Sequence, residues 1–342
     1  MSSQTAANAH SPSAILLGSN SIYPLWLAEG GVLLVDAGPD LEGLWELALA
    51  QAEGHGFGAG DVRAVLVTHY HIDHAGLAVR WAEAGARVLA GAMDVPALLS
   101  GRDWYEERTP LRLEALRRHG CPPEVIEAQR EQAGRHGYRW EPCPPNSVEA
   151  VADGTEFDLE GGTRLRVISA PGHTPGNLVG WVEATGELYS GDTLLPGTIP
   201  TPGLHFPSVG GLDGPDGAPG PRWPSLPPFL HSVRRLRQLP IRRILPGHGD
   251  VVDEPGKLLD RFEAHHERRA AAIRRLLGEQ ADTAYGVARR LFPRIGALQL
   301  AQATTEVVGH LDLLYGAGEA LREEFGGIVR FRLANDGTDD RV

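Results

Sequence analysis

The stretch Thr68-His69-Tyr70-His71-Ile72-Asp73-His74 places three histidines and one carboxylate within six consecutive residues. It follows directly on the apolar run Ala64–Val67, which predicts a short buried strand that ends where the polar side chains begin. Imidazole and carboxylate groups together suit Zn²⁺, and also Fe or Mn. A solvated loop has no structural use for four such groups side by side, so the stretch predicts a metal site.

Four other short apolar runs end in a turn rich in glycine or proline, and each turn begins with, or soon reaches, a His or an Asp. The residues concerned are Asp36, His173, Asp192 and His248. Residues at the carboxyl ends of neighbouring strands can converge in space although they lie far apart in the chain. The sequence therefore predicts a rigid metal site built from separated segments.

The complete set of motifs resembles the metallo-β-lactamase-fold hydrolase superfamily, in particular its glyoxalase-II-like and thioesterase-like members. The resemblance covers roughly residues 14–257 and rests on an HxHxDH loop followed by a His, an Asp and a His in the family order. It implies an α/β (α+β) fold, an αββα sandwich of two mixed β-sheets flanked by helices.

The resemblance also implies the metal ligands. One ion would be held by His69, His71 and His173. A second would be held by Asp73, His74 and His248, with Asp192 bridging the two ions. We expect two divalent cations, Zn²⁺ before Fe or Mn.

Two carboxylates allow other interpretations. Asp73 precedes a helical pattern at residues 75–84, and it would serve well as an N-cap. Its expected catalytic role is to accept or orient the proton of the nucleophile. Asp36 is expected outside the ligand set, at a strand end, as the carboxylate against which a ligating histidine leans.

Composition sets limits on the class of protein. The chain has 342 residues, 42% of them hydrophobic, which fits one large and one small domain. The formal charge of −12 argues against a nucleic-acid or anionic-membrane surface. Cys121 and Cys143 are too few for a disulfide framework. No secretory signal and no membrane-length apolar run stand out, so the expected location is cytoplasmic.

The chain divides into three expected parts. Residues 1–13 are expected to form a loose tail, and residues 14–257 the catalytic domain. Within the latter, the leucine spacing at 101–146 predicts a helical insertion of two helices. The Gly/Pro-rich stretch 201–228 is expected to form a long loop near the metals. Residues 258–342 are expected to form a separate C-terminal domain.

The C-terminal pattern predicts three helices and a two-stranded wing. Helical spacing runs from Leu258 to Leu277, then over 284–292 and about 304–315, and a Gly-Gly turn between alternating residues follows. It resembles the winged-helix tail of one metallo-β-lactamase-fold subfamily. Residues 258–342 contain 12 basic and 13 acidic residues, so we expect packing against the catalytic domain or a homodimer contact in preference to nucleic-acid binding.

The expected reaction is hydrolysis of an ester or a thioester, in which a metal-bridging hydroxide attacks the carbonyl of a small acyl substrate. A thiolate leaves without a dedicated general acid. Two alternatives share the fold: a phosphodiesterase or endoribonuclease, and an oxidoreductase that resembles the mononuclear-iron persulfide dioxygenases. β-Lactam hydrolysis is not expected, because the antibiotic-hydrolysing members lack the bridging Asp.

Three residues are candidates for contact with the substrate. His205, in the Gly/Pro-rich stretch, is the nearest candidate acid, although most such residues are ordinary loop histidines. Trp104 and Tyr105 belong to an insertion whose aromatic and aliphatic side chains, with Leu111, Leu113 and Trp140, could roof the site. The same side chains could instead pack the insertion onto the core.

Overall fold

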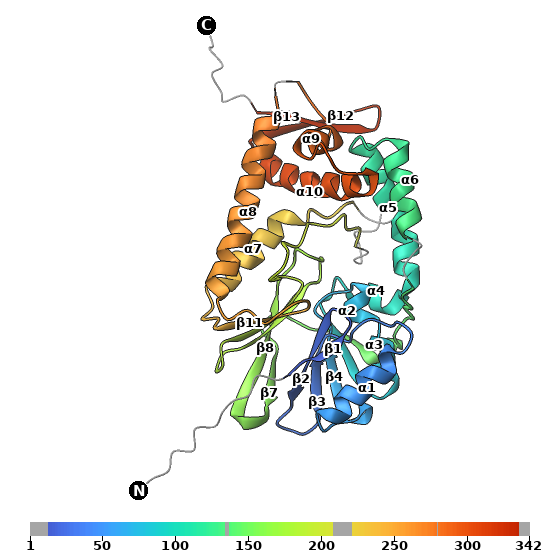
Figure 1. The fold of residues 1–342 in the computed structure, drawn as a ribbon, viewed down its shortest axis with the longest axis vertical. Coiled ribbons are helices and arrows are strands. Elements are labelled where there is room, and N and C mark those ends of the chain that lie inside the picture. The colour runs from blue at the N-terminus through green and yellow to red at the C-terminus, as the bar shows by residue number, and fades with distance from the viewer. Residues whose placement is uncertain (1–12, 134–136, 208–220, 279, 335–342) are drawn as a thin grey trace.

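The computed structural model describes residues 13–133, 137–207, 221–278 and 280–334. Figure 1 shows two β-sheets packed face to face in the lower part of the molecule, with helices on their outer faces and a helical layer above. The expected αββα sandwich is confirmed. The expected tail at 1–13 lies, apart from Ser13, outside the described residues. Within the described residues, no helix combines the length and the hydrophobicity that crossing a membrane requires.

The first sheet is mixed and has the strand order β1-β2-β3-β4-β5-β6. Strands β1 to β3 pair antiparallel, whereas β3 to β6 pair parallel. Because β3, β4 and β5 are parallel, their carboxyl ends lie at one edge. The strands are β1 (Ile15–Leu17), β2 (Asn20–Trp26), β3 (Val32–Val35), β4 (Val62–Leu66), β5 (Arg87–Ala90) and β6 (Val148–Ala150).

The second sheet is also mixed, with the order β11-β10-β9-β8-β7. Only β10 and β11 pair parallel. Leucine, valine and tyrosine side chains from the facing sides of both sheets form the central core. The strands are β7 (Glu156–Leu159), β8 (Thr163–Ser169), β9 (Leu178–Val182), β10 (Glu187–Gly191) and β11 (Arg243–Pro246). Short 3-10 turns are η1 (Ala59–Asp61), η2 (Pro145–Ser147) and η3 (Glu160–Gly162).

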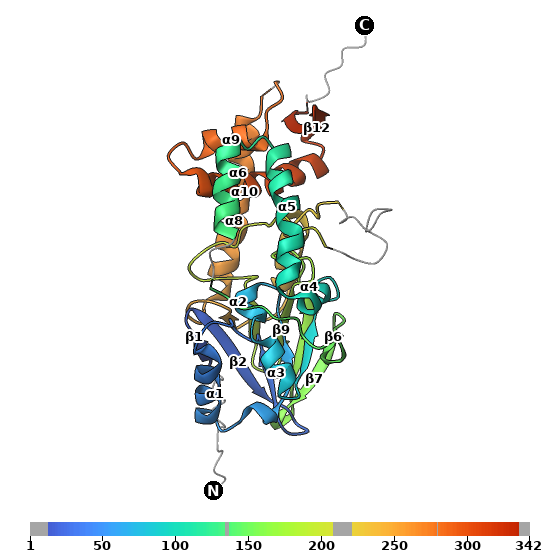
Figure 2. The same cartoon turned by 90° about the vertical axis from the view of Figure 1, so that its right-hand side faces the viewer.

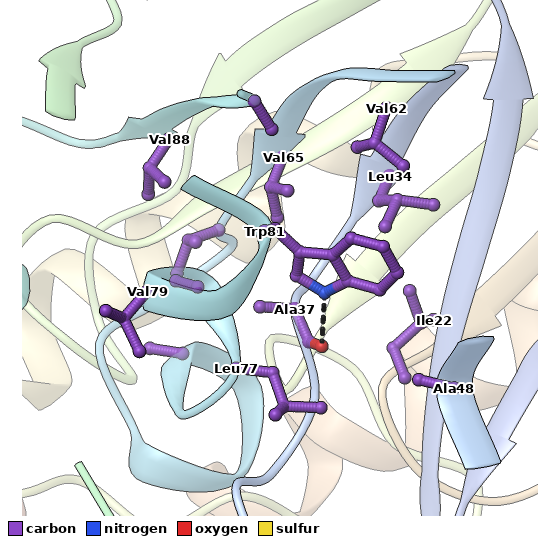
Figure 3. Packing of buried hydrophobic residues seen from close by; sticks show 14 of the residues in the cluster. Ile22, Leu34, Ala37, Ala48, Val62, Val65, Leu77, Val79, Trp81 and Val88 are labelled. Atoms are coloured by element: carbon purple, nitrogen blue, oxygen red, sulfur yellow. Dashed lines mark hydrogen bonds between the residues drawn. The ribbon is translucent and has the colours of Figure 1, made fainter. Parts of the chain in front are cut away.

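Helices cover the outer face of each sheet. On the first sheet lie α1 (Leu44–Gly54), α3 (Ala78–Glu83) and α4 (Val95–Ser100). Trp81 of α3 is fully buried there, and its indole N–H donates to the carbonyl oxygen of Ala37 at 3.2 Å (Figure 3). This bond ties the helix layer to the turn after β3, the turn that carries Asp36.

The second sheet is covered by α7 (Leu226–Leu236) and by the first half of α8 (Pro255–Leu276). Residues 201–207 and 221–225 contain no helix, as expected, whereas the predicted stretch 201–228 also includes the first turn of α7 and residues 208–220, which lie outside the described residues. Since α8 is continuous across residue 257, no linker separates the two expected parts there.

The helical layer above the sandwich combines the insertion with the C-terminal part. The insertion forms α5 (Arg102–Arg118) and α6 (Pro123–Ala133), and the C-terminal part adds α9 (Ala284–Leu291), α10 (Ala297–Gly316) and the hairpin β12 (Ala320–Phe325) and β13 (Ile328–Leu333). Side chains of all these elements and of the end of α8 share one hydrophobic cluster. The C-terminal part therefore packs against the insertion, while its classification as a winged helix and a homodimer contact stay predictions.

Two helix boundaries differ from the prediction. The pattern at 75–84 is split into α2 (Ile72–Ala75) and α3, because the chain turns at Gly76 and the Leu77 N–H donates to the Gly38 carbonyl at 2.9 Å. Asp73 therefore lies inside α2 and is not its N-cap, a position that His71 occupies. Helix α10 begins at Ala297, earlier than the expected 304, since its first turns are buried in the shared cluster.

Candidate metal centre

The seven expected ligands meet at one edge of the sandwich. His69 to His74 follow β4, and Asp36 follows β3. His173, Asp192 and His248 follow β8, β10 and β11 of the other sheet. The convergence expected from the carboxyl ends of these strands is therefore observed, and both sheets contribute to it.

The first set consists of His69, His71 and His173. The Nδ1 atom of His71 lies 3.1 Å from His69 Nε2 and 3.0 Å from His173 Nε2. Ligand atoms at about 2.0–2.1 Å from a tetrahedral Zn²⁺ lie about 3.3 Å from one another. The three nitrogens are thus spaced as ligands of one cation.

The second set consists of Asp73, His74 and His248. The Nε2 atom of His248 lies 3.1 Å from His74 Nε2 and 3.1 Å from Asp73 Oδ2. Asp192 stands between the sets, with Oδ1 3.3 Å from His74 Nε2 and Oδ2 3.7 Å from His173 Nε2. Both sets meet the geometric requirement for a three-ligand site, and Asp192 has one oxygen for each.

Burial keeps the histidines of the first set neutral, and it disfavours the ionised form of the two carboxylates. Burial and the nearby His173 lower the pKa of His71 to about 3, and burial also lowers the pKa of His69 and of His173. Burial raises the pKa of Asp73 and of Asp192, but the neighbouring imidazoles outweigh it and hold both values well below the usual range. Neutral imidazoles beside ionised carboxylates offer lone pairs to a cation.

Asp36 supports the second set from behind, as expected. Its Oδ2 accepts a hydrogen bond from His74 Nδ1 at 2.8 Å, which directs Nε2 toward His248 and Asp192. Its Oδ1 accepts from the backbone N–H and the hydroxyl of Thr68, both at 2.8 Å. Burial lowers the pKa of His74, but Asp192 and Asp36 raise it further, so this position favours a positive charge.

Asn20 was not among the sequence candidates. It follows the Gly18-Ser19 turn, and its Nδ2 lies 3.2 Å from Asp73 Oδ2 and 3.4 Å from His248 Nε2. Its side chain therefore supports the outer edge of the second set. No sequence pattern marks it, because the contact depends on β2 passing beside the turn after β11.

Asp94 was also missed, although a signal was present. Its buried carboxylate accepts hydrogen bonds from Tyr70 N at 3.1 Å, Thr174 Oγ1 at 2.6 Å and Gly176 N at 2.7 Å. Burial raises its pKa to about 7 against these bonds. Asp94 thus joins the loops that carry the first set. It follows the apolar run of β5 and a glycine, the same pattern that identified Asp36 and Asp192.

The three expected substrate-contact residues lie in different settings. His205 is buried, with Nδ1 3.0 Å from the Tyr70 hydroxyl, and burial holds its pKa well below the usual value. A neutral imidazole already paired with Tyr70 is poorly placed to act as an acid. Trp104 is buried beneath Tyr70 and under the guanidinium of Arg108, which lies 3.2 Å from its ring centre. Tyr105 lines a pocket.

That pocket has a volume of about 590 Å³ and lies between α5, α6 and the segment 138–140. At one end it is lined by Ile72, the residue between His71 and Asp73. Tyr105 and Trp140 complete this end, with ring centres 5.0 Å apart. Figure 2 shows α5 and α6 side by side above α2, with α5 reaching lower, to the level of α4. The pocket therefore shares Ile72 with the segment that carries His71 and Asp73.

Comparison with known proteins agrees with this geometry. The family model of the metallo-beta-lactamase superfamily matches residues 16–248, more than half of the chain. The "Probable metallo-hydrolase YqjP" of Bacillus subtilis (strain 168) is 27% identical over 318 residues, which are 92% of this chain and 93% of that protein. An atrochrysone carboxyl ACP thioesterase of Aspergillus fumigatus is 23% identical over 243 residues, 70% of this chain and 54% of that protein.

A solved structure shows the same overall arrangement. A metallo-beta-lactamase family protein from Thermus thermophilus superposes with a TM-score of 0.70 at 28% identity, over 95% of this chain and 97% of the other. The likeness includes the helical layer as well as the sandwich, given this coverage. The chain belongs to the metallo-beta-lactamase superfamily, and its His/Asp cluster is that of a metal-dependent hydrolase.

Proposed function

We propose that this chain hydrolyses carboxylic esters or thioesters, with acyl thioesters as the preferred substrates. The observation that carries the proposal is the apolar pocket lined in part by Ile72, which lies in the chain between the candidate ligands His71 and Asp73. An acyl group in this pocket would present its carbonyl carbon beside the ligands, whereas a polyanion gains nothing from an apolar wall. The thioesterase named among the relatives supports the same choice.

The donor set fits two divalent cations, and its imidazole-rich composition suits Zn²⁺. Such ions would supply a hydroxide nucleophile at neutral pH and polarise the carbonyl oxygen. In the overall reaction water adds to the carbonyl carbon and the C–S bond breaks, which gives a carboxylic acid and a thiol.

Asp73 is the residue proposed to handle the proton of the nucleophile. Its side chain is 27% exposed, so it lies at the open edge of the cluster. It is ionised, because its pKa is held low, and Asn20 donates to the same Oδ2 that faces His248. A carboxylate held ionised in this way can ligate a cation and orient the proton of the nucleophile.

The test is to supply the metal-loaded protein with a set of acyl thioesters and, in parallel, with an RNA oligonucleotide. We expect thioester turnover, and a loss of at least about 100-fold in Asp73→Asn. Asp158→Asn, at an exposed carboxylate on β7, serves as the matched control and is expected to keep full activity. RNA cleavage with inert thioesters would overturn the proposal.

A further inference from the structure

The pocket beside the ligand cluster is a groove that follows one face of α5. Its lining residues on this helix recur every three or four positions, the spacing of a single helical face. They are Arg102, Tyr105, Glu106, Thr109, Pro110, Leu113, Glu114 and Arg117. Fifteen steps at 1.5 Å per residue give the groove a length of about 22 Å.

The interior of the groove is apolar although charged residues border it. Leu113 of α5 and Ile126 of α6 line it beyond Tyr105 and Trp140. The charged groups of its arginines have polar partners: Arg117 pairs with Glu114 at 2.6 Å, Arg130 with Glu127 at 2.6 Å, and Arg102 donates to the Tyr138 carbonyl at 2.9 Å. Such side chains offer their carbon stems to the groove.

The dimensions restrict the occupant. A volume of about 590 Å³ along a path of about 22 Å suits a long, extended occupant. Single carbon–carbon bonds of about 1.5 Å advance about 1.25 Å per carbon in an extended chain, so the groove holds roughly 18 carbons.

We propose that this groove binds the tail of an unbranched long-chain acyl group, with the carbonyl at the Ile72 end. The far end lies at Arg117, the last lining residue along α5. The identity of the reaction rests on the function proposed above, whereas binding of the tail does not. Thr109, about 10 Å along α5 from Arg102, stands near the position of the eighth carbon.

The kinetic test uses metal-loaded protein and straight-chain acyl thioesters that range from two carbons to well beyond the length of the groove. We expect KM to fall by up to about fourfold for each added methylene and to level off near about eighteen carbons. Thr109→Phe blocks the groove midway, so KM should level off near eight carbons. Glu124→Phe, at an exposed position of α6 outside the groove, should keep the wild-type profile. If Thr109→Phe does not fold, Thr109→Leu takes its place with a smaller shift.

A binding test separates this inference from the proposed reaction. Hexadecanoate is titrated calorimetrically into metal-free protein, with octanoate for comparison. Tighter binding of hexadecanoate that is lost in Thr109→Phe supports the groove even if no thioester is hydrolysed. Thioester hydrolysis with a KM independent of chain length, together with no preference for hexadecanoate, would overturn the inference and leave the reaction standing.

Discussion

Replacing Asp36 by asparagine should weaken metal binding at the second set while leaving the fold largely intact. Asp36 has a φ of 67°, a left-handed conformation that asparagine adopts more readily than most residues. Its Oδ1 accepts two bonds from Thr68, and its Oδ2 accepts the bond from His74 Nδ1. An amide has only one acceptor oxygen, so one of these partners must face an NH₂ group.

The cost of each arrangement decides whether Thr68 or His74 faces the NH₂ group of the asparagine. Directing the NH₂ group at Thr68 would leave its buried backbone N–H without an acceptor, at a cost of about 1–3 kcal/mol. Without the Asp36 carboxylate, one of the two charges that raise the pKa of His74 is gone, and a neutral His74 avoids this cost by accepting at Nδ1 and carrying its proton on Nε2. Metal binding must then reverse the change at the same cost of about 1–3 kcal/mol, which corresponds to a loss of affinity of about 5- to 150-fold at the second set.

The assay is competition with a chelating indicator, which gives separate affinities for the two ions, combined with urea unfolding of the metal-free protein. Asp36→Ala gives the informative contrast: it should be less stable than Asp36→Asn by about 1–2 kcal/mol, because alanine is strained at this φ. Asp40→Asn is the matched control, a buried carboxylate whose ion pair is with Arg80. Second-ion affinity in Asp36→Asn within twofold of wild type would refute the reasoning.

Three further outcomes follow from the structure. Asp94→Ala leaves two buried backbone N–H groups without an acceptor, so we expect a loss of at least about 2 kcal/mol in urea unfolding and weaker binding at the first set; unchanged stability would contradict its role in joining the loops. Trp81→Ala should cost about 3–5 kcal/mol in the same assay, and a cost below about 1 kcal/mol would contradict its place in the core (Figure 3). Burial lowers the pKa of His266 to about 3 and of His310 to about 4, while unfolded histidine titrates near 6.5, so stability should fall as the pH drops from about 6.5 toward 3. In His266→Gln the urea midpoint of unfolding should fall less steeply with decreasing pH than in wild type. An unchanged slope would contradict the role of His266 in the acid dependence.

Local signals were sufficient to predict that the ligands converge, whereas the sandwich was expected from the family resemblance that the motifs carry. Each ligand follows a short apolar strand and a turn, and the motif around His71 is contiguous. Asp94 carried the same signal and was missed, because a lone Asp after a strand is common and its three partners come from two other loops. Asn20 carried no signal, since only the tertiary fold brings it to Asp73.

The helical layer was predicted only in part. Helical spacing identified α5, α6, α8, α9 and α10, but periodicity does not show which helices share a core. The insertion and the C-terminal part are separated by more than a hundred residues, yet Leu116 and Val125 pack with Val307 and Leu311. Packing against the C-terminal helices holds α5 and α6 in place, and the groove lies between these two helices.

The number of metal ions bound per chain tests the two-ion site most directly. Wild-type protein loaded with Zn²⁺ and freed of excess metal should contain about two ions per chain. His248→Ala should retain about one, because His69, His71 and His173 remain intact. A wild-type protein that binds a single ion, with His248→Ala indistinguishable from it, would contradict the account and would favour mononuclear chemistry at the first set.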